Sequence, residues 1–157
     1  KAEEADWDKC TNVAVMKDLG NKEFKKVLVP LAGGPNAALA LEYASILAEK
    51  DAEIVALTVG SDTSRFDIRK FIEDNKSRLH IAPEQVTVKV LFKEGIVKSI
   101  LEEAENYDLL VLGATNKPLL SRMAKDPIPE RVARECNMPF VMVKSSAGIR
   151  NWIRRWI

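Results

Sequence analysis

Continuous apolar runs alternate with amphipathic segments along most of the chain. KKVLVPL (residues 25–31) is the first clear run, and such a run is typical of a strand buried on both faces of a sheet. Residues 37–50 follow with helical spacing, and Gly34 or Asn36 marks the boundary of this helix. Its predicted apolar stripe comprises Leu39, Tyr43, Ile46 and Leu47.

The same unit of strand and helix recurs to the end of the domain. Strands are predicted over residues 53–60, 85–92, 108–113 and 140–144, and helices over residues 67–79, 96–107 and 127–136. This alternation indicates right-handed βαβ crossovers, and hence a parallel sheet with helices on both faces. Ligands of such sheets bind beyond the carboxyl ends of the strands, at the point where the strand order reverses. The loops after Leu31 and Gly113 are therefore the candidate site.

The two ends of the chain differ from this pattern. Residues 1–24 form an N-terminal extension, polar and acidic at first, which we expect to be partly disordered or to contain one short strand over residues 12–16. Residues 25–144 form the domain itself. Residues 145–157 form a basic amphipathic tail, in which Trp152, Ile153 and Trp156 lie on one helical stripe. We expect the tail to pack on its own domain or on a second chain, and the alternative is a membrane surface.

Length and composition are those of one globular domain. The chain has 157 residues and a net charge of +1, so no overall field favours a nucleic acid partner. Cys10 and Cys136 show no metal-binding spacing and are expected to be reduced thiols. Neither a signal peptide nor an apolar run of about 20 residues is recognisable, which favours a cytoplasmic location. The cytoplasmic face of a membrane is the alternative.

Three sequence blocks resemble the universal stress protein family over residues 25–144. They are VLVPLAGG before an alanine-rich helix, LLVLGAT, and LLSRM…PERVARECNMPFVMVK. The resemblance implies a five-stranded parallel sheet of the flavodoxin-like or nucleotide-hydrolase-like kind, and a homodimer. By the family's strand order the last strand is the edge of the sheet, so the expected dimer contact comprises Phe140, Val141, Met142 and Val143.

The resemblance also supplies a test for nucleotide binding. ATP-binding members carry a glycine, two residues, a second glycine, nine residues, then glycine and serine or threonine, with an aspartate just after the first strand. The corresponding residues here are Gly113, Asn116, Asp126, Pro127 and Ala32. Only the first glycine is kept.

The replacements weaken phosphate binding by separate mechanisms. Pro127 and Pro129 have no N–H group to offer at the helix N-terminus. Asp126, as the expected N-cap, would place a carboxylate where a phosphate would lie. The side chain of Asn116 hinders the close backbone approach that glycine permits. We therefore expect no cofactor.

An altered nucleotide site is the alternative. Side chains could replace the lost backbone contacts to ATP or AMP, and there is room beside the first strand. The candidate residues are Ala32, Gly33, Gly34, Gly113, Asn116, Lys117, Ser121 and Arg122. The simpler interpretation of the charged residues is a solvated surface.

No residues form a recognisable catalytic group. His80, the single histidine, is expected at a helix end on the surface, and Asp67 is expected to cap a helix. Glu102, Glu103 and Glu105 are expected to form a solvated face. We expect a non-enzymatic regulatory or binding module. A further alternative is a cytosolic regulatory domain of an amino-acid transporter, because VPLAGGP resembles the stress-protein domains fused to cationic amino-acid permeases.

Overall fold

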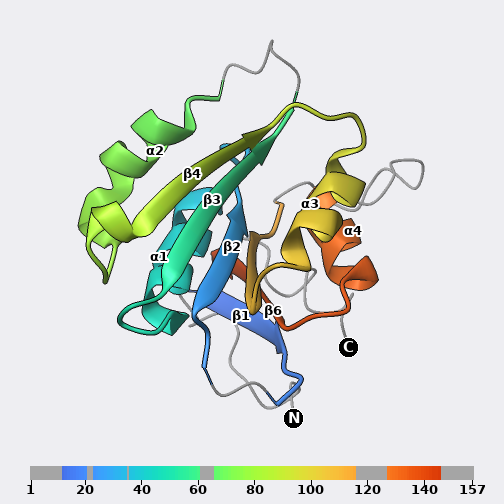
Figure 1. Cartoon of the computed structure of the whole chain (residues 1–157), viewed down its shortest axis with the longest axis horizontal. Coiled ribbons are helices and arrows are strands. Elements are labelled where there is room, and N and C mark those ends of the chain that lie inside the picture. The colour runs from blue at the N-terminus through green and yellow to red at the C-terminus, as the bar shows by residue number, and fades with distance from the viewer. Residues whose placement is uncertain (1–11, 21–22, 35, 61–65, 116–126, 146–157) are drawn as a thin grey trace.

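The computed structural model describes residues 12–20, 23–34, 36–60, 66–115 and 127–145, which form a six-stranded sheet between two layers of helices (Figure 1). The strand order is β1-β6-β5-β2-β3-β4. The strands are β1 (Asn12–Lys17), β2 (Lys26–Pro30), β3 (Glu53–Val59), β4 (Val86–Leu91), β5 (Leu109–Gly113) and β6 (Phe140–Ser145). The helices are α1 (Ala37–Leu47), α2 (Ile68–Asn75), α3 (Ile96–Ala104) and α4 (Ile128–Glu135), with short 3-10 turns η2 (Lys76–Arg78) and η3 (Pro83–Gln85).

The parallel sheet with helices on both faces is confirmed. Strands β2 to β6 pair in parallel, and the apolar runs of β2, β3, β5 and β6 are buried on both sides. Helices α1 and α2 pack over one face and α3 and α4 over the other, so the core has two halves. Successive side chains of a strand point to opposite faces, so the same strands contribute residues to both halves of the core.

The boundaries of the helices differ slightly from those predicted. Asn36 is the N-cap of α1, and Asp67 caps α2 by accepting a hydrogen bond from the Lys70 N–H at 3.0 Å. Ile46 does not join the apolar stripe of α1, because its side chain is 51% exposed. The alanines of α1 bring the helix close to the sheet, and buried Ala40 and Ala44 take part in the contact instead.

Strand β6 is not an edge strand, and this part of the sequence-based prediction was wrong. Its outer side is paired with β1, antiparallel, from Asn12↔Ser145 to Lys17↔Phe140. The pairing satisfies the backbone groups that an edge would expose, and it covers apolar surface with Val13 and Val15. The segment predicted to precede the domain therefore contributes a strand to its sheet. The strands Phe140–Ser145 and Asn12–Lys17 are neighbours in Figure 1.

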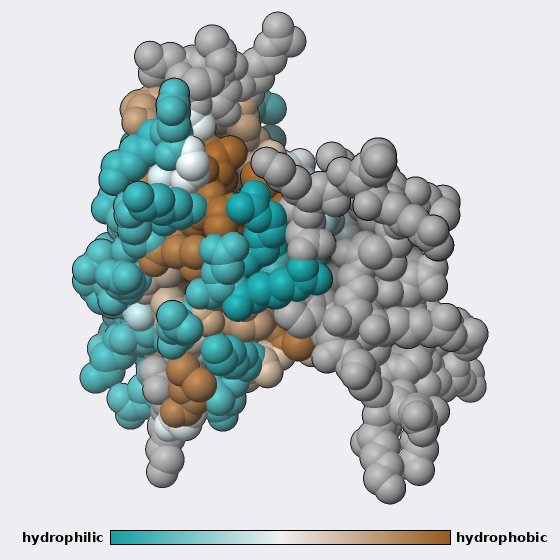
Figure 2. All heavy atoms as spheres, turned by 90° about the vertical axis from the view of Figure 1, so that its right-hand side faces the viewer, coloured by the Kyte–Doolittle hydropathy of each residue, from teal (hydrophilic) through white to brown (hydrophobic). Residues whose placement is uncertain are grey.

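The surface of the described residues carries apolar side chains in a strip rather than a broad patch on the side shown in Figure 2. The strip runs between hydrophilic groups. No helix within the described ranges combines the length and the apolar character needed to cross a bilayer.

Candidate functional site

The carboxyl ends of β2 and β5 lie side by side at the centre of the sheet. The two strands pair in parallel, with Val27 opposite Leu109. The chain leaves β2 toward α1 on one face and leaves β5 toward α4 on the other. The strand order therefore reverses between them, and this is where a ligand site is expected in such a sheet.

Asn36 closes this junction with its side chain. It is 1% exposed, its Nδ2 donates to the Ala114 carbonyl at 2.5 Å, and its Oδ1 accepts from the Ser145 N–H at 3.0 Å. The side chain makes no capping bond to its own helix. Asn36 thus ties the start of α1 to the ends of β5 and β6.

Gly113 has a structural role at the same place. A Cβ atom at this position would lie 2.6 Å from the Asn36 carbonyl oxygen and 2.8 Å from its carbon. Only a residue without a side chain allows the backbone of Asn36 to approach β5 this closely. The one motif position that the chain keeps is therefore explained by packing, without any ligand.

The loop after β2 meets an aromatic side chain. Gly33 has φ +72, and a Cβ there would lie 2.9 Å from Cδ2 of Phe66. Phe66 packs in turn on Phe71, with ring centroids 5.4 Å apart. Ala32, Gly33 and Gly34 are exposed. A Cβ at Gly34 would meet nothing within 4 Å, whereas Phe66 fills the space beside Gly33.

The N-terminus of α4 lies on the other side of the junction, and it begins differently from the prediction. Pro127, and not Asp126, is the N-cap, because the Pro127 carbonyl accepts the first helical bond, from Arg131 N–H at 3.0 Å. Pro129 occupies the first turn. Two of the backbone positions where an anion-binding helix presents N–H groups are thus prolines, which have none.

Glu130 joins α4 to the end of β5. Its side chain is buried at 1% exposure, and Oε1 accepts hydrogen bonds from the Thr115 N–H and hydroxyl, both at 3.2 Å. Oε2 is buried and has no hydrogen-bond partner among the residues that the structure describes. The Glu130 side chain lies in the first turn of α4, at the positive end of the helix dipole.

A second polar group lies away from the junction, between β4 and α3. Glu103 accepts hydrogen bonds from Lys89 Nζ at 2.6 Å and from the Tyr107 hydroxyl at 3.1 Å. Burial raises the pKa of Glu103, but these bonds outweigh it and hold the pKa below its ordinary value. Burial, followed by the nearby Glu103, raises the pKa of Tyr107 to about 12. Glu103 is therefore part of a paired cluster and not of a solvated face.

The remaining predicted site residues have separate outcomes. His80 is exposed after η2, as predicted. Within the described ranges, no cluster of three or more histidine, cysteine, aspartate or glutamate side chains could hold a metal ion. The loop candidates and the tail lie outside the described residues; they are Asn116, Lys117, Ser121, Arg122, Trp152, Ile153 and Trp156.

Sequence reasoning missed the residues that organise the junction. Asn36 was recognised only as a helix boundary, and Glu130, Thr115 and Phe66 were not singled out. A polar residue inside an otherwise apolar helix start was the available signal for Asn36. The sequence carried no such signal for Glu130, because its burial in α4 is seen in the structure alone.

A universal stress protein family model matches residues 23–144. A universal stress protein from Archaeoglobus fulgidus is 25% identical with a TM-score of 0.63, over 85% of this chain and 50% of its own. A universal stress protein in complex with cAMP is 16% identical with a TM-score of 0.61, over 78% of this chain and 98% of its own.

A third similar structure is UspA from Lactobacillus plantarum, with 17% identity and a TM-score of 0.58 over 79% of this chain and all of its own. No curated protein sequence matches the chain. The family match covers most of the sequence, and the solved structures share its fold. The chain therefore belongs to the universal stress protein family.

Proposed function

We propose that this chain is a non-enzymatic regulatory or binding module that works without a bound nucleotide. The observation that carries the proposal is the start of α4, where Pro127 is the N-cap and Pro129 follows in the first turn. Phosphate binding at a helix N-terminus depends on free N–H groups and the positive end of the dipole. This helix lacks N–H groups at two of those positions.

The contacts at the junction between the ends of β2 and β5 also support the proposal. Gly113, the motif glycine that remains, is required by the close approach of the Asn36 backbone. The side chain of Asn36 makes hydrogen bonds to the Ala114 carbonyl and the Ser145 N–H. Ala32 offers no carboxylate to a ribose. The side chain of Asn36 and the backbone at Gly113 are therefore engaged in contacts within the chain itself.

Adenine-nucleotide binding is the second candidate function. It is favoured by one observation, that a structure with the same fold is a complex with cAMP. In this chain such a ligand would depend on side chains of the loop after β5 and on the exposed backbone at Gly34. A regulatory role beside an amino-acid transporter is a third proposal, and the full-length reading frame would test it by the presence or absence of apolar spans upstream.

Thermal unfolding with and without nucleotide tests the first proposal. The full chain is heated with millimolar Mg-ATP, AMP or cAMP in separate samples. A ligand at 100 times its Kd would stabilise the fold by about 2.7 kcal/mol, which is a clear rise in Tm. We expect no rise for any of the three.

A restored variant is the matched control. Asp126→Gly with Pro127→Ser returns a glycine and a hydroxyl residue to the motif, and we expect Mg-ATP to raise the Tm of this variant more than that of the original chain. A rise in the original chain equal to that of the variant would overturn the nucleotide-independent proposal.

A further inference from the structure

Strand β4 is the edge of the sheet on the side away from β6. It ends the strand order of the described sheet, where it pairs with β3 alone, from Ile54↔Val86 to Val59↔Leu91. Figure 1 shows β4 at this outer position, with β3 on its inner side. An edge strand presents a row of backbone N–H and C=O groups to which another strand can bind.

The backbone groups of Val88 and Val90 point outward from this edge. The Leu91 carbonyl accepts a hydrogen bond from the Gly60 N–H at 3.1 Å, so the backbone of Leu91 faces the β3 side. Backbone groups of successive residues alternate between the two sides of a strand, so those of Val88 and Val90 point away from β3. Among the described residues, no hydrogen bond reaches these outward groups.

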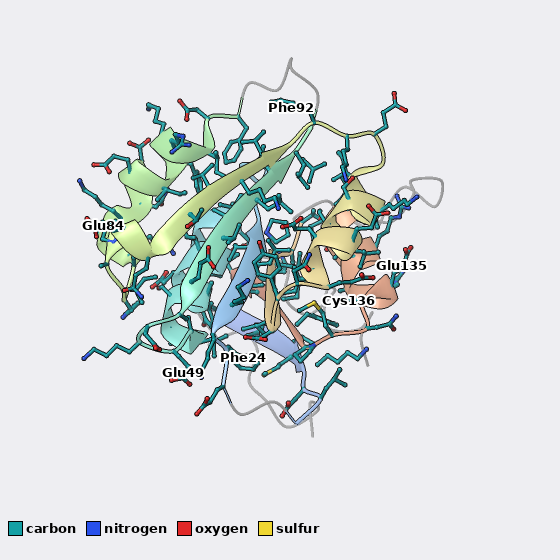
Figure 3. The ribbon with its side chains drawn as sticks, in the orientation of Figure 1. Phe24, Glu49, Glu84, Phe92, Glu135 and Cys136 are labelled. Atoms are coloured by element: carbon teal, nitrogen blue, oxygen red, sulfur yellow. The ribbon has the colours of Figure 1, made fainter. Side chains whose placement is uncertain are left out.

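One face of β4 carries an apolar row of side chains. Val86 and Val88 pack against the half of the core that α1 and α2 cover, and Val90 continues this row with 41% of its surface exposed. Phe92 follows directly after the strand (Figure 3), and it is 65% exposed. A strand added beside β4 would cover these side chains with apolar residues at every second position.

The opposite face of β4 is basic. Lys89 bonds to Glu103 of α3, and its side chain is still 43% exposed. Lys93, just after the strand, interacts electrostatically with the same carboxylate. Two positive charges therefore share one negative charge on this face. The intervening residues of an added strand would meet a net positive charge, which favours acidic side chains there.

A second copy of the chain fits this edge poorly. Two β4 strands related by a two-fold axis normal to the sheet would run antiparallel, with Lys89 and Lys93 of both copies on the same face. Like charges across neighbouring strands destabilise a sheet. Glu103 offsets one of the two charges in each copy and leaves the other unbalanced. The charges therefore favour a different chain that supplies carboxylates.

We propose that β4 binds an extended segment of another protein in which apolar and acidic residues alternate. The segment adds to the sheet as a further strand, with main-chain hydrogen bonds to Val88 and Val90. Its apolar residues cover Val90 and Phe92, and its acidic residues face Lys89 and Lys93. This surface is separate from the junction of β2 and β5, so the proposal holds whether or not a nucleotide binds there.

Titration of the full chain with short synthetic peptides tests the proposal. The probe peptide alternates valine with glutamate. Each of three control peptides differs from it in one respect: lysine replaces glutamate, the valines are grouped together, or alternate amides are N-methylated. We expect the probe to bind in isothermal titration calorimetry, and each control to bind about tenfold more weakly or less. The N-methylated control separates strand addition from attraction by charge and apolar contact.

Hydrogen exchange locates the contact on the strand. The amides of Val88 and Val90 should exchange fast in the free chain and slowly with the probe peptide. The Leu91 amide, on the β3 side, should be protected in both samples.

Three substitutions separate the charge from the backbone. Lys93→Glu should weaken binding of the probe about two- to fivefold, as loss of an exposed ion pair does, and strengthen binding of the lysine peptide. Lys25→Glu makes the same change of charge at the start of β2, where the side chain is 66% exposed, and should change neither. Val90→Pro removes one outward N–H, which an edge strand tolerates, and should weaken binding about tenfold.

Four results would overturn the proposal. The probe could fail to bind at millimolar concentration, or the grouped or N-methylated peptide could bind as tightly as the probe. The probe could bind without protecting the amides of Val88 and Val90. Protection of these two amides that grows with protein concentration, without any peptide, would show that a second copy covers the edge instead.

Discussion

The carbonyl oxygen of Asn36 lies 2.6 Å from the point that a Cβ atom on Gly113 would occupy. A methyl group at Gly113 must therefore displace the backbone at the start of α1 or the end of β5. We expect Gly113→Ala to lower the free energy of unfolding by about 1–3 kcal/mol, as overpacking of a tight contact does. Urea denaturation measures the change.

Gly34 provides the matched control for that substitution. Nothing lies within 4 Å of a Cβ at Gly34, and its φ is not in the left-handed region. Gly34→Ala should therefore leave the free energy of unfolding unchanged or raise it by about 0.4–1 kcal/mol, by restricting the unfolded chain. Equal losses at the two glycines would contradict the contact between Gly113 and Asn36.

The side chain of Asn36 carries a second prediction. Asn36→Ala leaves the buried Ala114 carbonyl and the half-buried Ser145 N–H without this partner. A buried polar group left unpaired costs about 1–3 kcal/mol, and we expect a loss of at least that size in thermal or urea unfolding. Asn106 is exposed and its Nδ2 donates to the backbone carbonyl of Glu103 at 3.3 Å, so Asn106→Ala is the control and should cost far less.

Tyr107 predicts how the protein responds to alkali. Its pKa is raised to about 12 in the folded chain from an ordinary value of 10.0, because of burial and Glu103. Below pH 10 the group is protonated in both states and its stabilisation is fully present. Between pH 10 and 12 only the unfolded chain loses the proton, so stability falls with rising pH across this window.

Ultraviolet absorbance of tyrosinate measures this directly. The chain has two tyrosines, so Tyr43→Phe leaves Tyr107 as the single signal. We expect its ionisation to lag behind that of the urea-denatured chain, and Glu103→Gln to bring the two curves closer. Ionisation of the folded variant near pH 10 would show that the burial of Tyr107 is incomplete.

Cys136 supplies a chemical prediction. Figure 3 shows it at the end of α4, where it is buried and its thiol lies 3.5 Å from the Met138 carbonyl. Burial raises the pKa of this thiol, so the reactive thiolate is scarce at neutral pH. In a Cys10→Ser variant we expect reaction with a thiol reagent to be many times slower in the folded chain than in urea. Equal rates would contradict this burial.

The parallel core was predictable because its signal is local. β2, β3, β5 and β6 are unbroken apolar runs, and each is separated from the next by a helix with its own periodicity. β1 carries a weaker signal, since its residues alternate between exposed and half-buried, and its partner strand begins more than 120 residues later. Pattern alone could show a possible strand there, but not its neighbour.

The candidate site was less predictable for a related reason. Asn36 bonds to groups 78 and 109 residues away, and Glu130 reaches Thr115 across a loop. No local spacing in the sequence marks such long-range contacts. The sequence therefore showed Gly113 as a position of a nucleotide-binding motif, and not as a packing position. The prolines at the start of α4 were predictable, because a missing N–H follows from residue type alone.

The pairing of the first strand with the last has a consequence for synthesis on the ribosome. β1 is made well before its partner residues, from Phe140 to Ser145, because these lie more than 120 residues further along the chain. Contacts between segments so distant in the chain form slowly, after the local ones. The βαβ units therefore assemble first, and β1 stays unpaired until β6 has been made. During that interval the nascent protein carries an apolar strand without a partner, and it depends on the rest of the domain to close over it.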